Sequence, residues 1–256
     1  MLYKYEIMRL NINLNMNLGF LISIFFINYL SASTCNFDVK VKLALRNDGF
    51  HRNITYGIVL NSECERDRYL YTGFIVGVDQ TLPPGVYANP DELSDFKRTQ
   101  KLNAIPKNRI NIELPAEQSY PSSVLVIGRV TDSKVYLWLP VHARYHKAVP
   151  GGGTARNEIE PPKLYLRCPD QRLDICDKAV SPSVTFLCNG SSKEKCSWKE
   201  IAYTTMTDAL IWRVPVGNTD HYYTVAIGTG VAVTVGSLYL LKSIHEYAVA
   251  IRTKRL

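Results

Sequence analysis

The chain has 256 residues, a formal net charge of +7 and 46% hydrophobic residues, which allows one domain with a real core or at most two small ones. No internal repeat or low-complexity tract occurs, which excludes a repeat array or a disordered chain. The basic residues form no dense patch interleaved with aromatics, so no nucleic-acid partner is predicted.

The first segment in chain order has the pattern of a signal peptide. Lys4 and Arg9 give it a weakly positive start, and the apolar stretch 18–30 carries no charge. This stretch is too short for a spanning helix and small residues follow it, so residues 1–33 are predicted to be a cleaved signal peptide. An uncleaved anchor, or a true start at a later methionine, is the alternative.

The next part, residues 34–221, has the texture of an all-β domain. Apolar and polar residues alternate over 39–46, which predicts a half-buried strand, and Asn47-Asp48-Gly49 follows as a turn. Further short apolar runs, separated by Pro, Gly and Asn, predict an antiparallel β-sandwich. The expected strands are 39–46, 54–60, 69–78, 124–130, 135–141, 163–167, 184–188 and 210–214.

Two stretches of this domain are predicted to differ from the strands. Residues 91–102 follow Asn89-Pro90 and are expected to form either a helix or a long polar loop. Residues 150–162 contain three consecutive glycines and two adjacent prolines, a pattern typical of an exposed connection. The glycine run lacks the Lys and Ser/Thr of a phosphate-binding loop, so no nucleotide site is predicted there.

Cysteines and glycosylation sequons indicate an oxidising, secretory compartment. An even number of cysteines behind a signal peptide favours disulfides, and the CxxC spacing of zinc clusters is absent, so no metal site is predicted. The pairing stays open, although two pairs of equal spacing are compatible with two small local loops. The candidate disulfide cysteines are Cys35, Cys64, Cys168, Cys176, Cys188 and Cys196. The candidate glycosylation sites are Asn53 and Asn189.

Residues 222–241 contain no charged residue and predict one transmembrane helix. At 1.5 Å per residue such a helix is about 30 Å long, which matches a bilayer core. Tyr222 and Tyr223 stand at one boundary, and residues 242–256 hold four basic residues and one acidic residue at the other. Basic residues stay cytoplasmic, so 242–256 is predicted to be a cytosolic tail and 34–221 to be luminal, a single-pass type I topology. A buried strand pair of a soluble domain is the alternative.

Small residues recur along this predicted span. Gly228, Ala232 and Gly236 stand at every fourth position, which places them on one face of a helix. Such a face lets a second helix approach closely. We therefore expect these three residues to be candidate contacts with a partner helix.

No residue pattern of a known catalyst is found. The chain has no Gly-x-Ser-x-Gly elbow, no HExxH helix and no Asp-x-Asp pair of the kind that many glycosyltransferases use. Transferases that use lipid-linked sugars also tend to have many spans, whereas one is predicted here. The sequence therefore predicts no catalytic residue, no cofactor and no enzyme activity of the chain itself.

The most distinctive segment precedes the glycine run. If it is extended, His142, Arg144 and His146 share one face. His142 and His146 would then lie roughly 13 Å apart, too far for two ligands of one zinc ion. We expect either a cationic stripe that contacts a lipid phosphate or an acidic partner, or the solvated face of an edge strand.

This segment also carries a family resemblance. Residues 140–146 (PVHARYH), followed by Pro150-Gly151-Gly152, Pro162 and 164–168 (LYLRC), resemble the PIG-X family. The close match covers 135–168. The order of signal, glycosylated luminal domain, single C-terminal span and short tail extends the resemblance to the whole chain.

The resemblance implies a non-catalytic accessory subunit of the first mannosyltransferase of glycosylphosphatidylinositol (GPI) anchor synthesis. Such a subunit binds and stabilises a multi-span catalytic subunit in the endoplasmic reticulum membrane. The catalytic subunit transfers mannose from dolichol-phosphate-mannose to the GPI precursor on the luminal side. Two other classes stay open: a single-pass cell-surface receptor or adhesion ectodomain, and a luminal enzyme anchored by its span.

Overall fold

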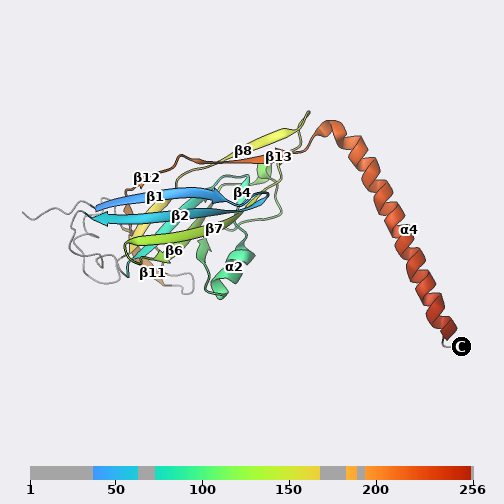
Figure 1. Cartoon of the computed structure of the whole chain (residues 1–256), viewed down its shortest axis with the longest axis horizontal. Coiled ribbons are helices and arrows are strands. Elements are labelled where there is room, and N and C mark those ends of the chain that lie inside the picture. Colours follow the sequence, from blue (N-terminus) through green and yellow to red (C-terminus); the bar gives the residue numbers. More distant parts are fainter. Residues whose placement is uncertain (1–36, 63–72, 168–182, 189–193, 255–256) are drawn as a thin grey trace, which may run out of the picture. The chain divides into compact units, whose positions relative to one another are not determined.

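The computed structural model describes residues 37–62, 73–167, 183–188 and 194–254. In these ranges the chain is mainly β-structure, followed by one long helix at the C-terminal end (Figure 1). The predicted all-β domain with one C-terminal helix is therefore confirmed. The predicted signal peptide lies outside the described residues, as do Cys35, Cys64, Cys168, Cys176 and Asn189.

The described strands form two main sheets and one two-stranded ribbon. The first sheet has the order β12-β1-β2-β7-β4, with the bounds Thr204–Thr205, Phe37–Arg46, His51–Ser62, Lys134–Ala143 and Val86–Tyr87. The second has the order β10-β11-β9-β3-β6-β5, with the bounds Ser183–Leu187, Lys195–Ile201, Lys163–Arg167, Ile75–Leu82, Ser122–Arg129 and Asn103–Pro106. The ribbon pairs β8 (Gly153–Ile159) with β13 (Leu210–Val216).

The first two strands form as the sequence predicts. Val39, Val41 and Leu43 of β1 are buried, and the lysines between them are exposed. Asn47 and Gly49 turn the chain with φ values of 69° and 82°, a left-handed conformation that asparagine and glycine tolerate. β1, β2 and β7 then lie side by side in the first sheet (Figure 1).

A buried polar contact links the two sheets. The Tyr56 hydroxyl of β2 donates a hydrogen bond of 3.1 Å to Gln80 Oε1 of β3, and both side chains are buried. Burial raises the pKa of Tyr56 well above its ordinary value, so the hydroxyl stays protonated as a donor. The amide of Gln80 donates to the carbonyls of Thr81 and Glu160, which leaves this buried group satisfied.

The interior strand β6, which lies between β3 and β5, is buried on both faces. Val124 and Val126 are buried on one face, and Leu125 and Ile127 on the other belong to a separate cluster with Trp198. This explains why β6 is a continuous apolar run without the alternation of a half-buried strand.

Two segments in the second half of the chain go beyond the sequence prediction. Residues 150–162, expected to be an exposed connection, contain β8, which pairs with β13 along its whole length, so that prediction was wrong. β8 carries mostly polar residues, and its position is decided by the buried Trp212 and Val214 of its partner strand.

A disulfide joins Cys188 to Cys196 and connects β10 with β11, one of the local pairs that spacing alone left open.

The stretch 91–102 contains a helix, α2 (Pro90–Arg98). The side chain of Asn89 caps it by accepting a hydrogen bond from the amide of Asp91, and proline occupies the first helical position. Leu93 is its buried residue. The helical alternative is therefore confirmed, and it places the first turn of α2 beside the strands described below.

Two single-turn helices, η1 (Ala116–Gln118) and η2 (Thr219–His221), precede the long C-terminal helix α4 (Tyr222–Lys254). α4 begins at the predicted residue, but it continues for 33 residues instead of ending near Leu241. The pair Lys242–Glu246, four residues apart at 3.8 Å, lies on this extension. The apolar side chains of α4 are exposed, and no other described part of the chain covers them. This is expected for a helix that is surrounded by lipid.

Candidate functional site at the end of β7

The distinctive histidine segment begins at the end of β7, where β2, β4 and α2 meet. In the sheet, His142 pairs with His51 of β2 on one side and with Tyr87 of β4 on the other. His142 therefore lies on an interior strand, and the edge-strand alternative is wrong at this position.

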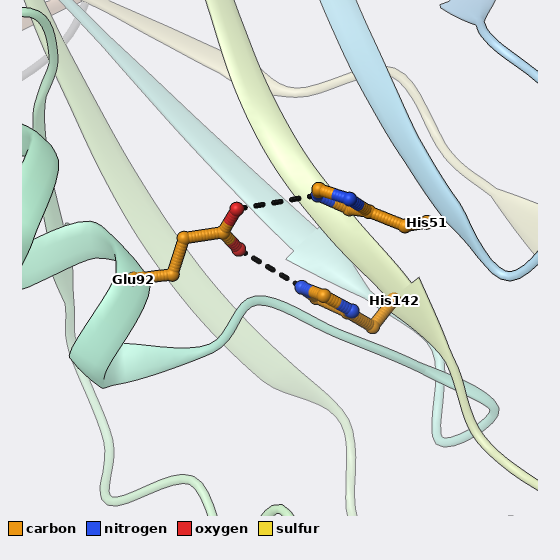
Figure 2. Close-up of side chains that lie close together, drawn as sticks. All are labelled: His51, Glu92 and His142. Carbon is orange, nitrogen blue, oxygen red and sulfur yellow. Dashed lines mark hydrogen bonds and ion pairs between the residues drawn. The ribbon is translucent and has the colours of Figure 1, made fainter.

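Figure 2 shows that His51, Glu92 and His142 converge. His51 Nε2 lies 3.2 Å from Glu92 Oε1, and His142 Nε2 lies 2.9 Å from Glu92 Oε2. The two imidazole rings stack with centroids 4.3 Å apart and an interplanar angle of 6°. One carboxylate therefore bridges two stacked histidines, which come from β2 and β7, and the carboxylate comes from the first turn of α2.

Aromatic and cationic groups continue the stack behind His142. The ring of Tyr87 lies 5.2 Å from that of His142, and the Arg144 guanidinium lies 4.5 Å from the centroid of Tyr87. Burial raises the pKa of Tyr87, and the Arg144 charge partly opposes this rise. Burial also lowers the pKa of Arg144, and the electrostatic interaction with the Tyr87 hydroxyl partly opposes this decrease.

The three residues expected to share one exposed face do not do so. Arg144 is only 6% exposed, and its Nη1 donates a hydrogen bond of 2.7 Å to the carbonyl of Leu114. His146 Nε2 lies 3.1 Å from Asn157 Nδ2 of β8, away from the His142 stack. The segment leaves the sheet after Ala143, which is why strand periodicity fails beyond it. Contact of these residues with a lipid or partner stays a prediction.

A glycine makes room for this arrangement. A Cβ added at Gly85 would lie 1.9 Å from Asn157 Oδ1 and 2.8 Å from His146 Cε1. The Gly85 carbonyl accepts a hydrogen bond of 2.8 Å from the amide of Arg144. Gly85 therefore permits close packing of the β3–β4 connection against the histidine segment, a role that the sequence analysis missed.

Sequence reasoning also missed His51 and Glu92. It tested His142 against His146 on the same strand, whereas the structure pairs it with a histidine 91 positions earlier, across the β2–β7 register. Chemically, the site offers two imidazole nitrogens and a carboxylate within 4.8 Å of one another. Such a set can bind a cation or exchange protons, and it contains no Ser or Cys nucleophile.

Comparison with known proteins identifies the family. Residues 47–245 match the family described as PIG-X / PBN1. This chain belongs to that family. The resemblance noted from residues 135–168 is therefore confirmed, and the matched range includes all three residues of the His51–Glu92–His142 site.

Curated relatives carry one shared description, "GPI alpha-1,4-mannosyltransferase I, stabilizing subunit". The protein of Mus musculus is 27% identical over 219 residues, and that of Rattus norvegicus 26% over 219 residues, each alignment covering 84% of both chains. The protein of Homo sapiens is 27% identical over 215 residues, covering 82% of this chain and 81% of the human one. No solved structure matches.

Two further sets of predicted site residues lie elsewhere in this PIG-X/PBN1 chain. Asn53 lies on β2 and lines a surface hollow together with Arg46, Tyr136 and Trp138. Gly228, Ala232 and Gly236 lie on α4, and a Cβ added at either glycine would meet nothing within 4 Å. Glycosylation and helix contact at these positions stay predictions.

Proposed function

We propose that this chain is the non-catalytic stabilising subunit of GPI mannosyltransferase I in the endoplasmic reticulum membrane. The observation that carries the proposal is the family match over 47–245, together with the description shared by the relatives. Its partner is a multi-span catalytic subunit, which transfers the first mannose from dolichol-phosphate-mannose to the GPI precursor.

The physical basis of stabilisation is mass action. A stabilising subunit that binds the folded catalytic subunit, but not its unfolded chain, raises the catalytic subunit's free energy of unfolding. The increase grows with the logarithm of the stabilising subunit's concentration divided by the Kd of the complex. α4 offers an uncovered apolar surface to a membrane partner, and the β domain offers a folded surface beside it in the sequence. The proposal therefore needs binding only, and it assigns no chemistry to this chain.

The proposed topology is type I, with residues 1–33 as a signal, 34–221 in the lumen, 222–241 in the membrane and 242–256 in the cytosol. The Cys188–Cys196 disulfide supports a luminal domain, because disulfides persist in oxidising compartments. Asn53 is partly exposed on β2, which leaves its side chain accessible for glycosylation if the domain is luminal. Asn53→Gln is expected to remove one glycan, seen as faster gel migration, whereas unchanged migration would contradict a luminal β2.

Depletion of this chain tests the proposed function. The expected result is a fall in both GPI-anchored proteins at the cell surface and the amount of the catalytic subunit, with both restored by the full chain. If both stay unchanged, the proposal is wrong. Glycans that remain sensitive to endoglycosidase H indicate retention in the reticulum, and complex glycans would instead favour the cell-surface receptor.

The proposed role of the span has a matched control on the same helix. Gly228→Leu and Gly236→Leu place bulk on the small-residue face, whereas Gly230→Leu places it about 200° away from Gly228. Helix contacts of this type contribute roughly 0.6–2 kcal/mol, so the first two variants should weaken co-purification of the catalytic subunit about 3- to 30-fold. Equal effects of all three variants would contradict a docking face while leaving the depletion result decisive for function.

A further inference from the structure

We propose that His51, Glu92 and His142 form a binding site for a divalent transition-metal cation of the zinc class. The inference concerns this site alone and is independent of the stabilising role. It rests on the convergence of two imidazoles and one carboxylate from three separate elements, which Figure 2 shows.

The distances between the ligand atoms are close to the ligand–ligand distances found around a bound zinc ion. With zinc bonds of about 2.0–2.2 Å in a tetrahedron, two ligand atoms lie roughly 3.4 Å apart. The Glu92 oxygens already lie 3.2 Å from His51 Nε2 and 2.9 Å from His142 Nε2. One ligand atom from each of the three residues lies within 4.8 Å of the other two. Because the two rings are stacked nearly parallel, one of them must turn out of the stack before both Nε2 lone pairs point at one cation, and the more exposed His51 has the room to do so.

The site is held by its surroundings yet open to solvent. The cross-strand pairing of His51 with His142 sets the two imidazoles side by side, and Tyr87 stacks on the other face of His142. The Asn89 cap and the buried Leu93 hold the first turn of α2, which carries Glu92. The side chains of His51, His142 and Glu92 are 55%, 24% and 20% exposed, which gives a cation a path of entry.

The ligand types select the class of cation. Imidazole with carboxylate suits zinc and its neighbours, whereas calcium and magnesium prefer oxygen ligands alone. The Arg144 guanidinium stacks on the Tyr87 ring and donates to the Leu114 carbonyl, so its charge is already engaged. Three protein ligands leave one position for water, and a bound cation would fasten α2 to the sheet.

Cobalt titration of the full chain tests the site. The untagged protein is purified in mild detergent, stripped with a chelator and titrated with Co²⁺, whose visible absorption reports four- or five-coordinate binding. The expected result is one Co²⁺ per chain, displaced by Zn²⁺, and an increase in Tm of about 5 °C at saturating Zn²⁺. Absence of the absorption up to millimolar Co²⁺ would overturn the proposal.

Three variants locate the binding. His51→Gln and Glu92→Gln should each weaken binding about 100-fold or more, because even outer-shell groups cost 10- to 100-fold. His146→Gln is the matched control, since His146 contacts Asn157 instead of this cluster. Retained binding in the first two variants, or equal loss in the control, would assign the cation to another place and overturn the proposal.

The variants are chosen so that loss of binding is not loss of fold. His51 is more than half exposed, and glutamine keeps a polar side chain there. Circular dichroism and Tm of each stripped variant, compared with the stripped wild type, establish that the fold is intact. His51→Gln with an unchanged metal-free Tm and no Co²⁺ absorption is the result that supports the site most directly.

Discussion

Replacement of Arg144 by alanine is expected to destabilise the β domain by about 2–4 kcal/mol. Arg144 is 6% exposed, its Nη1 donates to the Leu114 carbonyl at 2.7 Å, and its guanidinium stacks on Tyr87. The Leu114 contact holds the connection that leads into η1, whose Ala116 amide donates to the Tyr145 carbonyl. Arg144 therefore fastens this connection to the end of β7.

The magnitude follows from opposing contributions. A hydrogen bond from a charged donor contributes about 1.5–3 kcal/mol and a desolvated cation–π contact about 0.5–2 kcal/mol, and the buried stem adds packing. Against this, burial lowers the pKa of Arg144, and its Nε is buried without a partner among the described residues. Removal of the guanidinium recovers that cost, which brings the net loss to about 2–4 kcal/mol.

Arg144→Lys separates charge from shape. Lysine keeps the positive charge and removes the unpaired Nε, but it lacks the planar group that spans both the Leu114 carbonyl and the Tyr87 face. We expect a loss of about 1–2 kcal/mol, between the wild type and Arg144→Ala. Arg156→Ala serves as the control, because Arg156 is exposed and its pair with Glu158 at 3.3 Å contributes at most about 1 kcal/mol.

Thermal unfolding of the full chain in detergent, followed by tryptophan fluorescence at one scan rate, measures the effect. At about 2–4 °C per kcal/mol, Arg144→Ala should lower Tm by roughly 5–15 °C. An unchanged Tm, combined with loss of the co-purifying catalytic subunit, would refute this reasoning. It would assign Arg144 to partner contact, one of the two alternatives that the sequence left open.

Three further changes test other parts of the fold. Replacing Cys188 and Cys196 together by alanine should cost about 2.5 kcal/mol, the chain entropy of a loop with a sequence separation of 8, and an unchanged Tm would contradict it. Gly85→Ala should cost about 1–3 kcal/mol by its clash with Asn157, and adding Asn157→Ala should recover part of that loss; purely additive losses would exclude the clash. The pKa of Glu117 is lowered, chiefly by the hydrogen bond that its carboxylate accepts from the backbone amide of Lys147. The stabilisation that this carboxylate provides is therefore present above its unfolded pKa and is lost as pH falls through its folded pKa. Glu117→Gln should therefore lower the free energy of unfolding by less than about 1 kcal/mol at this exposed site at neutral pH, seen as a slightly lower Tm, and should have no effect at acidic pH. A difference in Tm that persists in acid would disprove this linkage.

The sequence by itself determined the features that depend on neighbouring residues. The alternation in β1 and the uncharged stretch from Tyr222 are local patterns, and each predicts its element directly. Asn89-Pro90 is a local start signal as well, but by itself it left a helix and a loop open for 91–102. The family signature in residues 135–168 is local as well. The C-terminal end of α4 lies beyond the predicted span, because residues of good helix propensity continue after the last residue of the uncharged stretch.

The tertiary structure decided the features that depend on residues far apart in the chain. β8 is a strand because β13 pairs with it, and its own polar sequence carries no such signal. The His51–Glu92–His142 site exists because the β2–β7 register and the position of α2 place three distant residues together. A slip of β7 by one residue against β2 would put His142 on the opposite face of the sheet from His51. Arg144 is buried for the same reason: Tyr87 and Leu114, which cover it, arrive from other parts of the chain.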